Sequence, residues 1–165
     1  MKIERIVKHL FTTQAQVRRH FDRSSLTAIE SAIKESEATH AGEIRFVVED
    51  ALDGLPLFQG QSARERAIDL FSQLRVWDTQ DNAGVLIYLL LADRAVEIVA
   101  DRGINEKVDS QEWRKICQQM ETAFRQSNYV SGVVSGVQAV TQHLVQHFPS
   151  VGGRGNELPD KPVVL

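Results

Sequence analysis

The chain has 165 residues and a mass of 18.5 kDa, with 42% hydrophobic and 25% charged residues. This length suits one domain with a sizeable core, and the composition excludes wholesale disorder. Nineteen basic and twenty-two acidic residues give a net charge of −3, which argues against a nucleic-acid binder. The single cysteine, Cys117, excludes an intramolecular disulfide.

The sequence shows no segment for export or for membrane insertion. Residues 1–5 carry no apolar stretch and no cleavage site of the secretory kind. The longest apolar run, residues 85–92, is too short to cross a bilayer. We therefore expect a cytoplasmic location, with a peripheral position at the inner membrane as the alternative.

The first forty residues predict helices. Between residues 5 and 21, apolar side chains recur at an imperfect helical spacing, which predicts a short helix, a break and a second helical turn. These apolar positions are Ile6, Leu10, Val17 and Phe21. Ser24 or Ser25 can cap a further helix that ends near residues 39–40.

The middle of the chain alternates between strand and helix. Residues 43–49 alternate in polarity and are rich in β-branched and aromatic side chains, which predicts a strand. Glycine and proline mark residues 50–60 as a loop. Ser62 and Glu65 then have the spacing of a capping box, which predicts the start of a helix.

The next two segments predict paired strands. Residues 84–91 are apolar on both faces, so we expect a central strand covered by helices on each side. Residues 95–99 follow after only Asp93 and Arg94, which predicts an antiparallel hairpin.

Two helices complete the domain. Asp109 or Ser110 caps the first, and the second runs from about residue 130 to residue 147. Gly132 and Gly136 lie four residues apart in this last helix, so another helix can approach closely there.

These elements predict an α/β fold in the order α-α-β-α-β-β-α-α. We expect a small mixed sheet of about three to four strands, covered by helices on both faces. Residues 1–149 form a single domain, of which residues 1–23 are an N-terminal helical extension. The glycine- and proline-rich residues 150–165 predict a disordered tail.

Topology divides the acidic residues between two edges of the predicted sheet. The connection from strand 43–49 through a helix to strand 84–91 should join parallel neighbours, so their amino ends meet at one edge. The antiparallel third strand brings its carboxyl end to that edge. One edge therefore collects Glu43, Asp78, Asp81, Asn82 and Asp101, and the other Glu49, Asp50, Asp53 and Asp93.

The first of these edges is the better candidate for a metal site. Ca²⁺ and Mg²⁺ prefer carboxylate and carbonyl oxygens from loops that can wrap the ion. The predicted ligands are Glu43, Asp78, Asp81, Asn82 and Asp101. Nearby, Arg102 and Lys107 could hold an anion such as phosphate. The alternatives are solvated acidic side chains that cap helices and form turns, and basic side chains that balance surface charge.

Other chemistries have less support. Cys117 lies on the apolar face of a predicted helix, which favours a core position over a nucleophile. The histidines do not form a zinc pattern, and His143 and His147 lack the H-E-x-x-H arrangement. No phosphate-binding loop or strand-linked G-x-G-x-x-G supports a nucleotide cofactor.

Several short phrases, in order from about Leu26 to Phe148, resemble the TPM domain family. They are Gly42-Glu43-Ile44, Asn82-Ala83-Gly84-Val85-Leu86-Ile87, Asp93-Arg94, Glu97-Ile98-Val99, Gly103-Ile104 and Asn128-Tyr129-Val130-Ser131-Gly132-Val133.

This resemblance implies a helix-covered central sheet with acidic side chains and a divalent metal at its edge. The family includes thylakoid-lumen proteins linked to photosystem II repair, some with acid phosphatase activity, and metal-binding bacterial members. The positions that match such a site are Glu43, Asp81, Asn82 and Asp101.

The sequence thus predicts a TPM-like domain that binds Ca²⁺ or Mg²⁺ at an acidic sheet edge. If it is an enzyme, we expect a metal-dependent phosphomonoesterase. The alternative is a non-catalytic binding or assembly module for a membrane-associated protein partner. We expect no nucleic acid, nucleotide cofactor or transmembrane segment.

Overall fold

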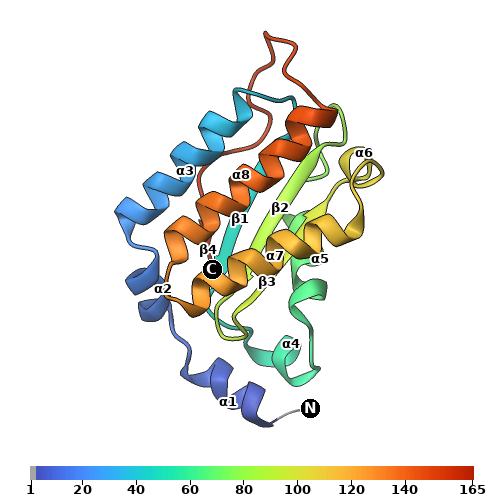
Figure 1. Cartoon of the computed structure of the whole chain (residues 1–165). Coiled ribbons are helices and arrows are strands. Elements are labelled where there is room, and N and C mark those ends of the chain that lie inside the picture. The colour runs from blue at the N-terminus through green and yellow to red at the C-terminus, as the bar shows by residue number, and fades with distance from the viewer. Residues whose placement is uncertain (1–2) are drawn as a thin grey trace.

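A mixed four-stranded sheet forms the centre of the molecule in the computed structural model, which describes residues 3–165 (Figure 1). The strand order is β3-β2-β1-β4. The strands are β1 (Glu43–Glu49), β2 (Gly84–Leu90), β3 (Ala95–Ala100) and β4 (Val163–Val164).

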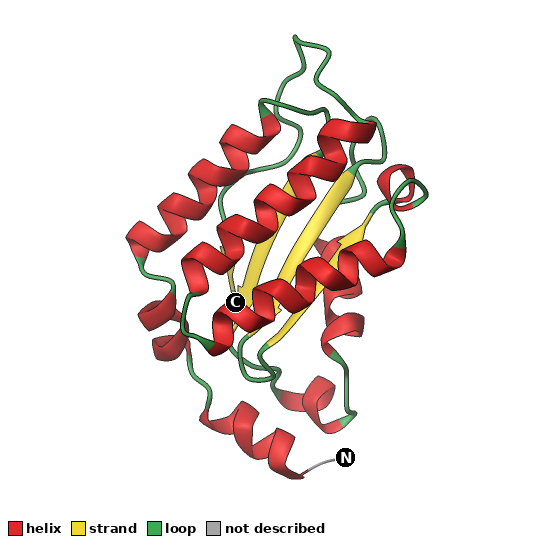
Figure 2. Ribbon diagram, viewed as in Figure 1, coloured by secondary structure: helices red, strands yellow, loops and turns green. Residues whose placement is uncertain are grey.

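Helices cover both faces of this sheet (Figure 2). They are α1 (Ile3–Phe11), α2 (Gln14–His20), α3 (Arg23–Glu37), α4 (Gly54–Phe58), α5 (Ala63–Gln73), α6 (Arg102–Asn105), α7 (Ser110–Arg125) and α8 (Tyr129–His147). This arrangement confirms the predicted α/β fold, to which the structure adds the two short helices α4 and α6.

The pairing of the strands confirms the predicted topology. β1 and β2 are parallel neighbours in which Glu43 lies opposite Gly84 and Glu49 opposite Leu90. β2 and β3 pair antiparallel. Their connection spans residues 91–94, longer than the predicted two-residue turn, and Arg94 adopts a left-handed backbone conformation in it.

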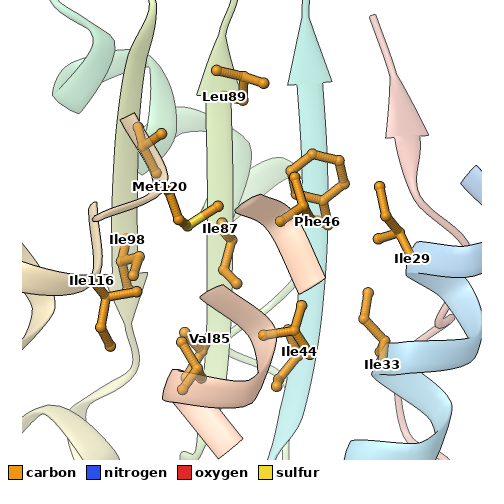
Figure 3. Close-up of a cluster of buried hydrophobic side chains, with 14 of the residues drawn as sticks. Ile29, Ile33, Ile44, Phe46, Val85, Ile87, Leu89, Ile98, Ile116 and Met120 are labelled. Carbon is orange, nitrogen blue, oxygen red and sulfur yellow. The ribbon is translucent and has the colours of Figure 1, made fainter. Parts of the chain in front are cut away.

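Alternating side chains of the central strands divide the core into two layers. Ile44 and Phe46 of β1 and Val85 and Ile87 of β2 face the layer of α3, α7 and α8 (Figure 3). Their neighbours Val47, Leu86, Tyr88 and Leu90 face α5. All seven residues of β2 are buried, as expected for a strand covered on both sides.

The helix starts follow capping chemistry. The Ser62 and Glu65 capping box is present at α5, and the side chain of Asp109 accepts a hydrogen bond at the start of α7. At α3, however, Asp22 caps the helix in place of Ser24 or Ser25.

Residues 150–165 do not form the disordered tail that their composition suggests. The segment leaves α8, loops beyond the sheet and returns along β1, where Val163 and Val164 pair with Val47 and Val48 (Figure 1). Leu158 packs into the α5-side core. A few apolar contacts and strand hydrogen bonds thus anchor a segment that has no hydrophobic period of its own.

The break predicted between the two N-terminal helices is present, because Thr12 and Thr13 lie between α1 and α2. Val17 and Phe21 are buried as their spacing predicts. In α1, by contrast, Leu10 is 66% exposed and His9 is buried.

The close approach predicted at Gly132 and Gly136 is present, because both glycines of α8 face α7. A Cβ at Gly136 would lie 2.3 Å from the Met120 sulfur, and one at Gly132 2.8 Å from the Phe124 ring. Among residues 3–165, no helix is long and apolar enough to span a membrane.

We predict that Gly84→Ala destabilises the fold by about 1–3 kcal/mol, as overpacking does. A Cβ at this position would lie 2.0 Å from the carbonyl oxygen of Val76, and the backbone cannot move as a flexible side chain can. Urea denaturation measures the change. Gly155→Ala is the matched control, since a Cβ there meets open space. Equal stability of the two variants would contradict the packing argument.

Candidate functional site

A pocket of about 430 Å³ opens at the amino end of β1. Its walls come from the end of α3, the turn into β1 and the returning C-terminal segment. Charged and polar side chains line it, among them Lys34, Glu37, His40, Glu43, Arg154 and Asp160.

Three carboxylates converge in this pocket, and we call them the acidic trio. Glu37 ends α3, Glu43 begins β1 and Asp160 lies in the C-terminal segment. One ligand oxygen from each lies within 4.8 Å of the others. Among residues 3–165, this is the one group of three or more acidic, histidine or cysteine side chains that approach so closely.

Backbone amides hold two members of the trio in place. The N–H of Ile44 donates to Glu37 Oε1 at 2.8 Å. The N–H groups of Glu157 and Leu158 donate to the Glu43 carboxylate at 3.1 and 3.3 Å. The C-terminal segment is therefore attached to β1 at the site itself.

The electrostatics of the trio favour proton uptake. Burial raises the pKa of Glu37 to about 10, helped by a hydrogen bond with Asp160 and by the charge of Glu43, against the Ile44 amide. Burial also raises the pKa of Glu43, although the amides of Glu157 and Leu158 oppose the shift. Protonation of Glu37 thus relieves the repulsion of crowded carboxylates.

Arg45 is the nearest buried cation, and its main contacts are with the backbone of the C-terminal segment. Its guanidinium donates to the carbonyl oxygens of Pro159 and Lys161. Burial lowers the pKa of Arg45, while Asp160 and Glu37 oppose that shift through their charge. Among the described residues, no member of the trio forms an ion pair.

Backbone hydrogen bonds confirm that the predicted edge exists. The N–H of Glu43 donates to Ala83 O at 3.2 Å, and that of Asp101 to Gly84 O at 2.8 Å. The N–H of Ile104 donates to Asn82 O at 3.3 Å. The start of β1, the loop before β2 and the end of β3 therefore meet, as the topology implied.

The side chains predicted at this edge have separate partners. Asp78 pairs with Arg75 at 2.7 Å, and Asp81 pairs with Arg154. Asn82 is exposed, with a left-handed backbone conformation. Only Glu43 of the predicted ligands belongs to the acidic trio, so cation binding by the full predicted set stays a prediction.

Asp101 differs from these because it is buried. One carboxylate oxygen, Oδ1, accepts from the N–H of Arg102 at 2.7 Å, and the other, Oδ2, is buried without a hydrogen-bond partner. Arg102 and Lys107, the predicted anion ligands, are exposed nearby, and their role also stays a prediction.

At the opposite edge, arginines compensate two of the four acidic residues, Glu49 and Asp93. Glu49 accepts two hydrogen bonds from Arg66, at 2.9 and 2.7 Å, and one from the Tyr88 hydroxyl at 2.6 Å. Asp93 is bound by Arg5 and His9. Paired carboxylates of this kind have little capacity left for a metal ion.

Ser36 and His40 are buried and in contact, as a nucleophile and its general base would be. Here, however, the histidine donates to the serine and does not accept from it. His40 Nδ1 accepts from the N–H of Gly42, so its proton lies on Nε2, which donates to Ser36 Oγ at 2.8 Å. Ser36 in turn contacts Thr141 Oγ1 at 2.5 Å. Burial lowers the pKa of His40 to about 4. A histidine that donates to the serine cannot take its proton, so this chain of hydrogen bonds is structural.

Cys117 packs partly buried against the core, as predicted. Burial raises the pKa of its thiol to about 12, which disfavours the reactive thiolate.

Sequence reasoning missed two members of the trio, Glu37 and Asp160. Glu37 looked like one more polar residue in the last turn of a helix. Asp160 lies in the segment expected to be disordered. The sequence does carry a signal that this segment packs on the protein. In Leu158-Pro-Asp-Lys-Pro-Val-Val-Leu165, apolar residues lie on both sides of Asp160, a pattern that indicates a docked strand.

We predict that Glu37→Gln removes part of the pH dependence of folding. The pKa of Glu37 in the folded protein lies above the ordinary glutamate value of 4.5, so folding takes up a proton at pH values between the two. The free energy of unfolding of the wild type should therefore fall as the pH rises from 5 to 8, by up to about 1.4 kcal/mol per pH unit. The neutral glutamine should flatten this slope and stabilise the protein at pH 8.

Urea denaturation with a chelator present measures these slopes. Glu35→Gln is the matched control, because Glu35 is exposed on the same helix. Parallel pH profiles for Glu37→Gln and the wild type would contradict the assigned pKa direction.

Comparison with known proteins agrees with this fold. The family model of the TPM domain matches residues 16–143. The NMR structure of the BA42 protein from the psychrophilic bacterium Bizionia argentinensis is 30% identical, with a TM-score of 0.73, and the match covers 86% of this chain and 92% of that one. No curated protein matches the chain.

Two further solution structures share the fold. The N-terminal domain of a P. gingivalis protein has 23% identity and a TM-score of 0.59, covering 79% of this chain and 82% of that one. The N-terminal domain of a Corynebacterium glutamicum protein has 14% identity and a TM-score of 0.53, covering 82% and 78%. The family match covers most of the sequence, and this chain therefore belongs to the TPM domain family.

Proposed function

We propose that this TPM domain binds a divalent cation, Ca²⁺ or Mg²⁺, at the acidic trio of Glu37, Glu43 and Asp160. The supporting observation is their convergence within 4.8 Å in an open pocket. Hard divalent cations prefer such oxygens, and carbonyl oxygens or water can complete the coordination.

The chemistry of the trio suits exchange of a proton for a metal ion. The pKa of Glu37 is raised by burial, by hydrogen bonding with Asp160 and by the charge of Glu43. A divalent cation would replace the proton of Glu37 and relieve the same repulsion. Binding should therefore release protons and strengthen as the pH rises.

The sequence-predicted ligands offer a second location for the same cation. Asp101 has a buried oxygen without a partner, and Asp81 and Asn82 lie on the adjoining loop. Glu43 belongs to both sets. Substitutions that affect only one set can therefore distinguish the two locations.

A phosphomonoesterase is the second candidate function, because Lys34 and Arg154 line the same pocket as the trio. A bound cation would supply Lewis-acid chemistry toward a phosphate ester. Lys34 and Arg154 would bind its negative oxygens, and Arg102 and Lys107 are the alternative anion ligands. A non-catalytic module for a membrane-associated protein partner stays the rival, and a cytoplasmic location stays a prediction.

We predict that Ca²⁺ or Mg²⁺ raises the melting temperature of the wild type, and more at pH 8 than at pH 6, because binding to the native state adds stability. Isothermal titration calorimetry in buffers of different ionisation enthalpy should show proton release. Glu37→Gln and Asp160→Asn should weaken binding at least about tenfold, as expected when a ligand is lost.

Matched variants identify which ligand set is used. Glu43→Gln should weaken binding at either location, and Asp81→Asn with Asp101→Asn should do so only at the second. Glu35→Gln should bind like the wild type. Absence of both binding heat and thermal stabilisation at pH 8 would refute the cation proposal.

Hydrolysis of p-nitrophenyl phosphate tests the enzymatic proposal separately. We predict metal-dependent turnover that persists through purification and falls at least about tenfold in Glu43→Gln, as loss of metal-ion catalysis requires. Cation binding without turnover, together with one stoichiometric protein partner, would favour the binding module instead.

A further inference from the structure

Helix α1 places Arg5 and His9 inward, beside the partly buried Ile6, and leaves the other four of its five apolar and aromatic side chains exposed to solvent. Ile3, Val7, Leu10 and Phe11 are 77%, 44%, 66% and 74% exposed. On the inward side, His9 is 3% exposed. A helix at the surface of a globular protein normally has the opposite orientation, with its apolar side against the core.

Hydrogen bonds fix this orientation. Arg5 donates to the Asp93 carboxylate through Nε and Nη2, at 2.9 to 3.2 Å, and to the Gln61 carbonyl oxygen at 2.8 Å. His9 Nδ1 accepts from the N–H of Leu52, and Nε2 lies 2.9 Å from Asp93. Rotating α1 to bury its apolar side would break these contacts and leave Asp93 partly buried without its cation.

The apolar side extends onto a neighbouring helix. α4 contacts α1 and exposes Leu55 and Phe58, at 71% and 55%. We call these six side chains of α1 and α4 the apolar end; they are Ile3, Val7, Leu10, Phe11, Leu55 and Phe58. In Figure 1, α1 and α4 lie together at the end of the molecule opposite the start of β1. Exposed apolar side chains gathered on two contacting helices mark a candidate interaction site.

A basic pocket adjoins the apolar end. It has a volume of about 540 Å³, lies between α1, α2 and the β2–β3 turn, and shares Phe11 with the apolar end. Its basic side chains are Lys8, Arg19, His20 and Arg94. Its one carboxylate, Asp93, is neutralised by Arg5.

The cations of this pocket are available to a ligand. Among residues 3–165, Lys8, Arg19 and Arg94 form no ion pair. Burial lowers the pKa of His20, and the positive charges of Arg19 and Arg94 lower it further, which reflects the positive potential there. Glu4 is the one acidic residue in α1.

We propose that the apolar end docks on the surface of a bilayer that contains anionic phospholipid. The apolar side chains of α1 and α4 enter the acyl boundary, and Lys8, Arg19 and Arg94 contact the phosphates of the headgroups. Apolar insertion together with basic residues at the rim is the chemistry by which interfacial helices recognise anionic membranes.

The charge distribution favours a bilayer over a second copy of the chain. A symmetric dimer through the apolar end would bring the same basic rim of each copy close to the other. Like charges so placed oppose association. An anionic lipid surface instead complements both the apolar side chains and the cations.

Vesicle co-sedimentation of the full chain tests this proposal. We expect binding to vesicles of phosphatidylcholine mixed with phosphatidylglycerol, weak binding to phosphatidylcholine alone, and release by added salt. Leu10→Ser with Phe11→Ser should lower the partition coefficient at least about tenfold. Lys8→Glu and Arg19→Glu should each lower it about fivefold or more.

Matched controls use exposed residues elsewhere on the chain. Val151→Ser removes an apolar side chain that is 74% exposed in the C-terminal segment, and Arg114→Glu reverses an exposed charge on α7. Both should bind like the wild type. Urea denaturation of each variant separates lost binding from lost folding.

Three outcomes would overturn the proposal. The first is wild-type binding by the Leu10→Ser, Phe11→Ser variant, and the second is equal binding to both vesicle types. The third is absence of vesicle binding by the wild type; a concentration-dependent dimer that the same variant abolishes, seen by sedimentation velocity, would then identify a second copy of the chain as the partner of the apolar end. None of these outcomes bears on cation binding at the acidic trio.

Discussion

The parallel pairing of β1 with β2 is the constraint on which the rest of the structure depends. Seven residues of each strand align, from Glu43 opposite Gly84 to Glu49 opposite Leu90. Both strands are buried along their whole length, so charged side chains collect where the strands end. Because the strands run the same way, their amino ends share one edge with the carboxyl end of β3. The pocket lies at this edge, between the end of α3, the turn into β1 and the returning C-terminal segment.

A buried carboxylate lies at each end of β1, and the two carboxylates have different partners. At the carboxyl end, Glu49 is compensated by the guanidinium of Arg66 and by Tyr88, so its charge is satisfied within the fold. At the amino end, the hydrogen-bond donors that residues 3–165 offer Glu43 are backbone amides alone, and two more acids lie beside it. Amides stabilise a carboxylate but do not cancel its charge, so the repulsion remains and a proton relieves it. This residual negative charge distinguishes a candidate cation site from a structural ion pair.

The fold could be predicted from sequence because its signals are local and repeated. Alternation over residues 43–49, the apolar run from residue 84 and the Ser62–Glu65 capping box each specify an element without reference to the others. The acidic trio could not be predicted in this way. It joins the end of a helix, the start of a strand and a segment that returns from beyond α8, and Asp160 is 117 residues from Glu43. The C-terminal segment is ordered by hydrogen bonds from Arg45, by the packing of its own Leu158 into the α5-side core and by pairing with β1, none of which composition reveals.

The orientation of helix α1 could not be predicted from its sequence either. Apolar spacing identifies an amphipathic helix, but it does not say which side faces the protein. Here the choice is made by Asp93, at the β2–β3 turn, which is partly buried and requires a cation. Arg5 supplies that cation, and His9, whose Nδ1 accepts from Leu52, donates to Asp93 from Nε2; both contacts need the side of α1 that carries Arg5 and His9 to face inward. Electrostatic compensation at one end of the sheet therefore exposes Ile3, Val7, Leu10 and Phe11. The hairpin turn that completes the sheet thus also sets which surface the protein presents at the end opposite its acidic pocket.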